Sequence, residues 1–519
     1  MESQEKYPVT VDRTKLSPVL PSNIGRYDGE KRVIVRDTVL NPGLHTSVNY
    51  PPPSYSAHKW RISIHPEGKP YYHTTSLVTV VTEANIQDEK IVQQLQGWTS
   101  LLESLVVELG FSLGTKSDFS VPLEADVTDP ALVPRSQDQL ADARRDYPSL
   151  DLFLKLDLQT GGCFYYFVEH ATRVVFWVDG LKSEDLGLLP SISSNHLKHA
   201  LEENYWIHVE MFPVHPNRFQ VEVLDDLMAV FMFGLSDQST SRVSTFPYTK
   251  EECGRHLENL ARMKGRPFDS HMIACIARLW SVMSNFKFIT HHGEDHCRLS
   301  RNRSILGDIV RKRNKVLTVI SLFLFNLPVS TRVRLEDLFF DGLVYEYTWE
   351  PAIREIQSEW LTYAILTLGL IVCNLLAFPV VPVAALAQAS LVLCTAILII
   401  AIILSQHYRG LEKLQASDAA LFMSKHDTKR GCQALAIVFS LPKALSAWAL
   451  VLFAIQMLWS AMDKLPLRAI LPTCAALIIL SSTIWLGIIP AYSNRLASDS
   501  TLVCDGFRKR SKQTEMEYV

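Results

Sequence analysis

The pattern of hydrophobic and polar positions divides the chain into two halves of different character. Residues 361–405 form a 45-residue stretch with no Asp, Glu, Lys or Arg, and residues 444–462 and 469–493 are also free of these residue types. A helix that crosses a bilayer needs roughly 20 apolar residues. The region before these stretches alternates between short β-type runs and amphipathic helical stripes. The sequence therefore predicts an α+β portion followed by an all-α transmembrane bundle.

Two prolines interrupt the longest apolar stretch, and they predict a turn between two spans. Pro379 and Pro382 remove backbone donors and disfavour helix at the residues before them. We therefore expect four transmembrane helices, at residues 360–378, 383–405, 441–462 and 467–490. Lys and Arg gather in the loop between the second and third spans and in the tail after the fourth. The positive-inside rule then predicts a multi-pass protein of the membrane with cytosolic N- and C-termini.

Two β-type patterns precede the membrane region. In the first, within residues 56–86, Trp60 and the run RISI lead to a turn at 65–68, followed by Tyr71, Tyr72 and the run LVTVV. In the second, within residues 151–182, the strands 164–168 and 173–178 flank a turn. Runs of this length around turn residues predict small antiparallel meanders.

Both meanders resemble the WW domain, whose pattern is a Trp, a Tyr-Tyr pair, a His-x-Thr turn and a second Trp. The resemblance implies that Tyr166 and Trp177 clasp a proline-rich peptide, with Val168 and His170 as the neighbouring pocket. It assigns a structural role to Trp60, Tyr71 and Tyr72.

Each meander matches only half of the WW pattern. Thr82 stands at the position of the second Trp in the first meander, and Lys155 stands at the position of the first Trp in the second. Two alternatives follow. Trp177 could pack as core against the helix expected at residues 194–211, or the two incomplete meanders could pair into one composite sheet.

A proline motif lies in the N-terminal tail, residues 1–55, which we expect to be disordered because it is rich in Pro, Ser and Asn. Pro52, Pro53 and Tyr55 form a PPxY sequence. It resembles the docking site for WW-containing ubiquitin ligases of the HECT class, because proline-rich segments dock in aromatic grooves. The alternative is a chance proline run before the first strand.

The remaining segments complete the expected domain order. Residues 87–150 are predicted to hold a helix and a linker, 183–355 a helical cytosolic region, 356–492 the transmembrane region and 493–519 a cytosolic tail. Apolar residues at helical spacing predict helices at 91–109, 194–211, 249–264 and 270–289. Residues 298–315 are basic and residues 316–328 apolar, which favours equally a membrane-surface segment and a buried core helix.

The candidate chemistry is sparse. Residues 291–297 collect three histidines, two acids and a cysteine, but without the spacing of a metal motif, so we expect a solvated loop. The nine cysteines contain no CxxC pair, and the net charge of −3 gives no basic field for nucleic acid. Phosphate loops, GxSxG, HExxH and kinase motifs are not found. We therefore predict no catalytic residue, no metal, no cofactor and no enzymatic activity.

The order of these parts resembles that of uncharacterised fungal, mainly basidiomycete, membrane proteins. The resemblance lies in the segments HPEGKPYY, YYFVEHATRVVFWVD, LEENYWIHVEMFP and ALAIVFSLPKALSAW. It implies an architecture and no activity. The function that we expect is that of a membrane-anchored protein-interaction or scaffold protein. The alternatives are a channel or transporter and a membrane-tethered enzyme, and the lipid bilayer is the expected partner in every case.

Overall fold

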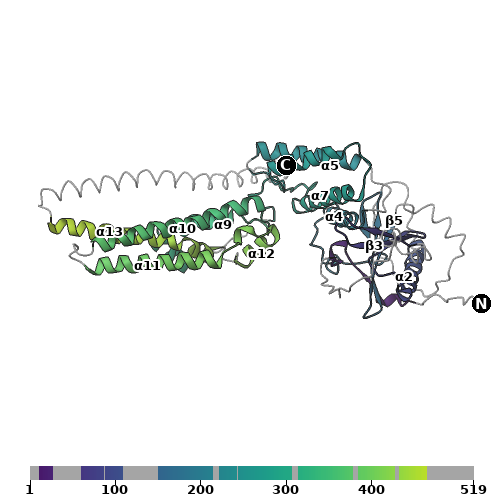
Figure 1. The fold of residues 1–519 in the computed structure, drawn as a ribbon, viewed down its shortest axis with the longest axis horizontal. Helices are drawn as coiled ribbons and strands as arrows, with labels where there is room; N and C mark the ends of the chain where they lie inside the picture. Colours follow the sequence, from purple (N-terminus) through teal and green to yellow (C-terminus); the bar gives the residue numbers. More distant parts are fainter. Residues whose placement is uncertain are drawn as a thin grey trace, which may run out of the picture. The chain divides into compact units, whose positions relative to one another are not determined.

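The computed structural model divides the chain into two compact units, unit 1 (Met1–Gly307) and unit 2 (Asp308–Val519) (Figure 1). This boundary precedes the start of the transmembrane region that hydropathy predicts at residue 356. The structure describes residues 11–26, 60–86, 88–108, 150–213, 221–241, 243–306, 314–377, 384–426 and 432–464.

Unit 1 is built on one seven-stranded mixed sheet. The first meander supplies β2 (Arg61–Ile64), β3 (Pro70–Thr75) and β4 (Thr79–Thr82), and the second supplies β5 (Leu150–Asp157), β6 (Gly162–Glu169) and β7 (Val174–Phe176). Strand β4 pairs with β5 in parallel, with Thr79 opposite Asp151. Two separate WW-like hairpins are therefore not confirmed, and the structure agrees with the alternative of one composite sheet.

Residues 11–26 are ordered, which corrects the expectation of a disordered tail for this part of residues 1–55. Residues 13–15 and 21–23 form single 3₁₀ turns, and β1 (Leu16–Pro18) between them pairs with β6 in parallel. Leu20 and Ile24 are each only 2% exposed. These two apolar side chains explain the order, because burying them offsets the entropy of fixing the segment. The PPxY residues Pro52, Pro53 and Tyr55 lie outside the described residues.

Helices cover both faces of the sheet. Along β5 the side chains alternate, so Leu152 and Leu154 pack with α2 (Glu89–Glu108), whereas Phe153 packs with α4 (Ser194–Met211) and α7 (Ser270–Ile289). A strand with one neighbouring layer on each face is apolar at consecutive positions, which is the pattern of the run LDLFL. The helices α2, α4 and α7 lie where the sequence predicts them.

A further helical layer packs on α7. It contains α5 (Val221–Thr240) and α6 (Lys250–Met263), and α6 begins with a capping box in which Thr249 and Glu252 bond reciprocally. Apolar periodicity predicts α6 but not α5. The exposed Met232 and Phe233 add apolar residues to the polar face of α5 and so obscure its periodicity.

Unit 2 is all helical over its described residues. Its helices are α8 (Lys315–Phe323), α9 (Leu327–Glu336), α10 (Glu346–Ala377), α11 (Ala384–His407), α12 (Ala416–His426) and α13 (Gln433–Lys464), with a 3₁₀ turn at Leu411–Lys413. Helices α10 and α13 begin before the predicted spans. A charged segment, 346–359, continues α10 ahead of its apolar part, and in α13 the segment 433–440, whose Leu435, Ala436 and Phe439 are buried in the core, precedes the predicted span.

Four described helices are long and apolar enough to cross a membrane. One is α7, whose apolar window is 56% buried inside unit 1, so its apolar residues belong to the core of that unit. The other three are α10, α11 and α13, which correspond to the first three predicted spans. The predicted fourth span, residues 467–490, lies outside the described residues.

A close contact at a glycine gives a test of the packing of unit 1. A Cβ atom at Gly234 of α5 would lie 2.4 Å from the ring of the buried Phe246, whereas a Cβ at Gly254 of α6 would meet nothing within 4 Å. Gly234→Ala should destabilise the protein by about 1–3 kcal/mol through overpacking. Gly254→Ala should stabilise it by about 0.5–1 kcal/mol through helix propensity. Thermal unfolding of the detergent-solubilised chain checks both, and equal effects would contradict this packing.

Candidate functional site

The peptide groove that the WW resemblance implies is not formed. Tyr166 and Val168 are fully buried, because α4 lies over this face of the sheet. Trp177 is partly buried, and its indole Nε1 donates a hydrogen bond of 3.1 Å to the backbone oxygen of Val19. A proline-rich ligand requires an open aromatic face. The prediction of a clasp made by Tyr166 and Trp177 is therefore wrong for this fold.

The residues with a predicted structural role are in the core. Tyr71 is fully buried on the α4 side of the sheet, where its ring packs edge-on against Phe212 at a centroid distance of 5.1 Å. Trp60 and Tyr72 are buried on the α2 side. The aromatic residues of the first meander thus build both layers of the core.

Two of the predicted groove residues, Tyr166 and His170, belong to a buried chain of polar groups. The Tyr166 hydroxyl lies 3.0 Å from His208 Nδ1, and His208 Nε2 lies 3.4 Å from Asp151 Oδ2. The same Asp151 Oδ2 lies 2.7 Å from His170 Nε2, and His170 Nδ1 lies 3.2 Å from the Tyr205 hydroxyl. One carboxylate oxygen therefore joins two histidine–tyrosine arms.

Strand and helix periodicities bring these groups together. Asp151 stands opposite Val168 in the β5–β6 ladder, and side chains two apart on β6 place Tyr166 on the same face. Tyr205 and His208 are three residues apart on α4 and therefore share its inner face. His170 follows β6 in a turn in which the Glu169 carboxylate accepts hydrogen bonds from the backbone of Ala171 and the hydroxyl of Thr172.

Burial fixes the protonation state of the two tyrosines. It raises the pKa of Tyr166 well above its ordinary value, and it also raises the pKa of Tyr205. Both hydroxyls therefore keep their protons and can donate to the histidines. Asp151 is 4% exposed and His208 is 0% exposed, so the network is shielded from water. Asp151, His170 and His208 each offer a ligand atom that could hold a metal ion.

The histidine-rich loop at residues 291–297 is largely solvated, as the sequence predicts, and His291 is its one buried residue. The ring of His291, which is 9% exposed, stacks on His196 of α4 at a centroid distance of 4.4 Å. His196 Nδ1 accepts from the backbone of Ile192, so its Nε2 donates to the Phe288 oxygen at 2.8 Å. The loop thus ties the start of α4 to the end of α7.

An open pocket of about 530 Å³ lies on another side of unit 1. It is lined by the N-terminal segment, the β2–β3 turn and the end of α4, through residues Ser22, Asn23, Gly25, Arg26, His65, Ile207, Glu210 and Met211. Pockets of this size hold small ligands or single side chains of a partner.

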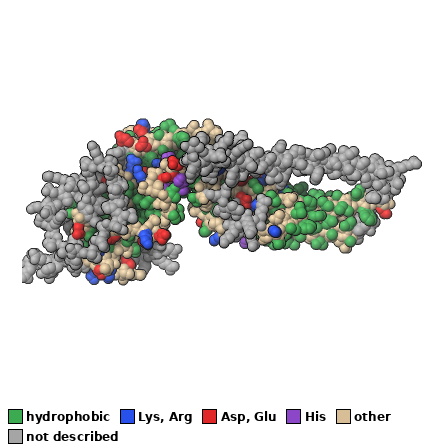
Figure 2. Space-filling model, turned by 180° about the vertical axis from the view of Figure 1, so that it is seen from behind, with side chains coloured by type: hydrophobic (Ala, Val, Ile, Leu, Met, Phe, Trp, Pro, Cys, Tyr) green, Lys and Arg blue, Asp and Glu red, His purple; other side chains and the backbone are tan. Residues whose placement is uncertain are grey.

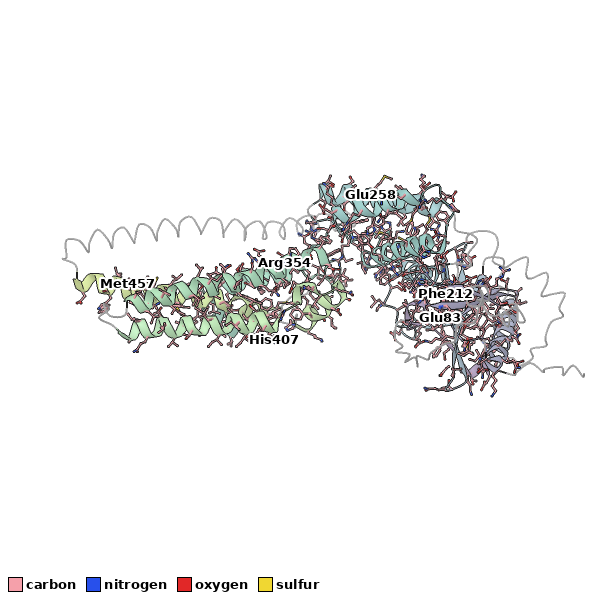
Figure 3. All side chains as sticks on the ribbon, viewed as in Figure 1. Glu83, Phe212, Glu258, Arg354, His407 and Met457 are labelled. Atoms are coloured by element: carbon pink, nitrogen blue, oxygen red, sulfur yellow. The ribbon has the colours of Figure 1, made fainter. Side chains whose placement is uncertain are left out.

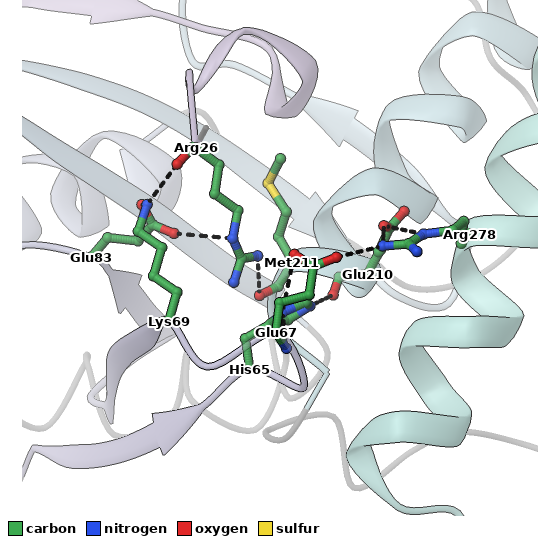
Figure 4. Close-up of polar contacts among 8 residues, drawn as sticks. All are labelled: Arg26, His65, Glu67, Lys69, Glu83, Glu210, Met211 and Arg278. Carbon is green, nitrogen blue, oxygen red and sulfur yellow. Dashed lines mark hydrogen bonds and ion pairs between the residues drawn. The ribbon is translucent and has the colours of Figure 1, made fainter. Parts of the chain in front are cut away.

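Charged groups surround this pocket (Figure 4). Arg26 Nη1 donates to the Met211 oxygen at 2.9 Å, while its Nη2 is buried and finds no hydrogen-bond partner among the described residues. The Arg278 guanidinium reaches the carboxylates of Glu210 and Glu67 at 2.7 and 2.9 Å. Arg26 Nε also lies 3.8 Å from the Glu83 carboxylate, so Nη2 is the atom of this guanidinium that would favour an acidic ligand.

His65 has a defined tautomer beside Arg26. Its Nδ1 accepts a hydrogen bond from the backbone N–H of Glu67 at 3.1 Å. Its Nε2 therefore donates to the backbone oxygen of Glu210 at 2.8 Å. Burial, and next the Arg26 charge, lower the pKa of His65. The ring is therefore a neutral structural link rather than an available acid or base.

Sequence patterns indicate only part of the buried network. The aromatic hairpin points to Tyr166 and His170, but no pattern points to Asp151, Tyr205 or His208. The available signals were an acid at the start of an apolar strand and a tyrosine and a histidine three apart on an amphipathic helix. Neither signal shows that α4 packs over β5 and β6, which is what brings these side chains together.

Glu203 on α4 gives a test of pH dependence in unit 1. Burial raises the pKa of its carboxyl to about 7, whereas the unfolded value is near 4.5. The unfolded chain loses this proton first, so Glu203 should reduce stability progressively as the pH rises from about 4.5 to 7. Glu203→Gln should remove up to roughly 3 kcal/mol of this loss.

The measurement is the difference in unfolding free energy between pH 5 and pH 8 for wild type and variant. The exposed Glu258 provides the matched control through Glu258→Gln. A pH dependence that is unchanged by Glu203→Gln would show that this carboxyl is solvated.

Comparison with protein-family models, with curated proteins and with solved structures finds no match to this chain.

Proposed function

We propose that the chain is an integral membrane protein in which unit 2 is the bilayer anchor and unit 1 is a non-enzymatic interaction unit. The observation that carries the proposal is the exposed apolar surface of α10, α11 and α13. Hydrophobic side chains gather over these helices in one continuous area (Figure 2). A surface of this kind is stable in lipid and would be an aggregation site in water.

The exposed side chains form a belt on each helix. More than half of the surface of each of the following is exposed: Leu361, Ile365, Leu366, Leu368, Val372, Leu375 and Leu376 on α10, Val392, Ile399, Ile402 and Ile403 on α11, and Leu450 and Trp459 on α13. The core between the helices at this level is small and includes Leu370, Cys394, Ile397 and Ala449. This arrangement, apolar outside and tightly packed inside, is the one expected of helices in lipid.

A polar link joins the three helices inside this belt. Asn374 Nδ2 lies 3.2 Å from Ser390 Oγ, and Ser390 Oγ donates to the Ala449 backbone oxygen at 3.2 Å. Hydrogen bonds between apolar helices hold a bundle together where no water competes. The buried Asn374 Oδ1 has no hydrogen-bond partner among the described residues. The bonds that do form run from helix to helix, which supports an anchor more than a path for a solute.

The opposite end of the bundle is polar and has its own core. Arg354 and His407 lie toward this end, and Met457 lies toward the other (Figure 3). Glu359 accepts from Arg334 at 2.9 Å and lies 3.4 Å from Lys443. The positive-inside rule supports placing this end, and both termini of the chain, on the cytosolic side.

Helix α8 supports attachment at the same membrane surface. Val316, Leu322 and Phe323 are about two-thirds exposed, and Ser321 is the buried residue of this helix. Trp448 of α13 donates through its Nε1 to the Phe323 oxygen at 2.8 Å. The apolar residues of α8 are thus continuous with the bundle, which favours the membrane-surface interpretation over a buried core helix.

Two features of unit 1 support interaction rather than catalysis. Its titratable cluster at Asp151, His170 and His208 is shielded from water, so a substrate has no direct access to it. Its open pocket beside Arg26 has the size and charge to receive an acidic group of a ligand or partner. The PPxY motif adds a docking sequence for a WW-containing ubiquitin ligase.

A channel or transporter is the second candidate, and one observation favours it. Gln456 of α13 is fully buried, and neither polar atom of its amide has a partner among the described residues. A buried amide at membrane depth either bonds another helix or lines a polar path.

Native cysteines test the anchor directly. Cys373 on α10 and Cys275 on α7 are both exposed on the surface of the protein, and Cys394 on α11 is buried. In permeabilised native vesicles a water-soluble maleimide should label Cys275 and leave Cys373 unlabelled, because lipid covers α10. After solubilisation in a denaturing detergent all three should react, as read by peptide mass spectrometry.

Permeabilised vesicles expose both sides of the membrane, so a difference between the two cysteines reflects burial in lipid and not sidedness. Cys394 shows the rate expected of a thiol covered by protein. Labelling of Cys373 as fast as Cys275 in intact lipid would contradict the proposed anchor.

The PPxY proposal is tested with the full-length protein and the purified WW domain of a HECT ligase. Titration calorimetry should show binding that Tyr55→Ala weakens at least about tenfold, because the tyrosine fills the aromatic groove. Tyr7→Ala, in the same tail, is the matched control and should bind like wild type. Equal binding by Tyr55→Ala and wild type would contradict the docking role.

A further inference from the structure

The ligand-type atoms of the buried network converge on one point. Asp151 Oδ2 and a ring nitrogen from each of His170 and His208 lie within 4.8 Å of one another. Two imidazoles and one carboxylate are a common donor set for zinc and for iron(II). We propose that Asp151, His170 and His208 bind one Zn²⁺ ion. Zinc is the better fit to this closely surrounded site, because it needs four ligands, whereas iron(II) sites keep more positions open.

The distances are close to those of a tetrahedral site. Bonds of roughly 2.0–2.1 Å place neighbouring ligand atoms roughly 3.4 Å apart. The separation of Asp151 Oδ2 and His208 Nε2 is 3.4 Å, and that of Asp151 Oδ2 and His170 Nε2 is 2.7 Å. The second separation has to lengthen by about 0.7 Å, and the two histidine nitrogens, which lie within 4.8 Å of each other, have to reach the same separation of roughly 3.4 Å.

His170 is the ligand that can make this adjustment. It lies in the turn after β6, and its side chain is 11% exposed, whereas the His208 side chain is fully buried on α4. The turn is therefore both the flexible side of the site and the side from which an ion would enter. Asp151 and His208 stand on a central strand and a packed helix, which supply the rigid part of the site.

The tyrosines orient both imidazoles. Each histidine Nδ1 bonds a tyrosine hydroxyl, which directs each Nε2 toward Asp151. Metal-binding histidines are usually held in this way through the second ring nitrogen. The geometry therefore contains the outer shell of a metal site as well as its ligands.

The two imidazoles carry the same number of protons with and without the metal ion. Without metal, each hydroxyl donates to Nδ1, and each Nε2–H donates to the Asp151 carboxylate. With metal, the ring proton is on Nδ1 and is donated to the hydroxyl oxygen, and Nε2 binds the ion. Both imidazoles are neutral throughout, because a hydroxyl can donate or accept. Burial of a carboxylate is unfavourable unless cations or donors balance it, and a divalent ion would do so directly.

The experiment uses the full-length protein in detergent without a histidine tag. It is loaded with Zn²⁺, dialysed against metal-free buffer and analysed by mass spectrometry of the metal. We expect about one zinc per chain in wild type. His208→Gln and Asp151→Asn should lose most of it, and His271→Gln, which changes an exposed histidine of α7, should retain it. Tyr205→Phe should weaken binding about 10–100-fold.

Two measurements on the wild-type protein do not depend on the folding of variants. Zn²⁺ should raise the unfolding temperature, because the three ligands meet only in the folded state. Co²⁺ should give the visible absorption of a tetrahedral site with nitrogen and oxygen ligands. Failure of wild type to retain zinc and to show this absorption would overturn the proposal. Zinc that survives both His208→Gln and Asp151→Asn but is lost with His291→Gln would also overturn it, and would assign binding to the loop.

Discussion

The parallel pairing of β4 with β5 is the interaction on which the architecture of unit 1 depends. Each meander alone has three strands, which is about the minimum for a sheet that is stable by itself. Pairing at Thr79–Val81 joins them into one sheet, and the Thr82 hydroxyl extends the contact by donating to the Leu154 oxygen at 2.7 Å. The joined sheet is wide enough to carry α2 on one face and α4 with α7 on the other. Asp151, at the end of this pairing, is thereby placed beneath α4.

The same pairing explains how much could be predicted. The strands of both meanders, α2, α4 and α7 follow from local periodicity, and the sequence locates them well. The parallel junction joins residues separated by the long segment 83–149, and no local pattern specifies it. The network at Asp151 depends on the packing of α4 over the β5–β6 hairpin, so the hairpin pattern indicates only Tyr166 on β6 and His170 in the turn after it. Strand β1 has only three residues and no pattern of its own. It is held in place by the burial of Leu20 and Ile24, which follow it in the sequence, so it could not be predicted.

Buried polar groups need hydrogen-bond partners in both units, although unit 1 surrounds them with a protein core and unit 2 with apolar helices. In unit 1 the Asp151 carboxylate is balanced by two histidines, which are held in turn by tyrosine hydroxyls. In unit 2 Asn374 reaches Ser390 across helices whose outer surfaces are apolar. An unpaired polar group is costly in a protein core and in lipid alike. Each network therefore fixes which elements are neighbours, a specificity that apolar contacts alone do not supply.

The WW-like aromatic pattern finds its explanation in this packing. In a free-standing three-stranded domain one face of the sheet stays open, and a Tyr–Trp pair on it can receive a peptide. Here the seven-stranded sheet is covered on both faces, so Tyr166 turns its hydroxyl to His208 and Trp177 donates to the N-terminal segment. The part of the pattern that the structure retains is the turn, in which Glu169 accepts from Thr172 and positions His170. A turn can keep its chemistry when the strand beside it is buried, because its bonds are local. A binding face cannot, because it requires the absence of a neighbouring layer.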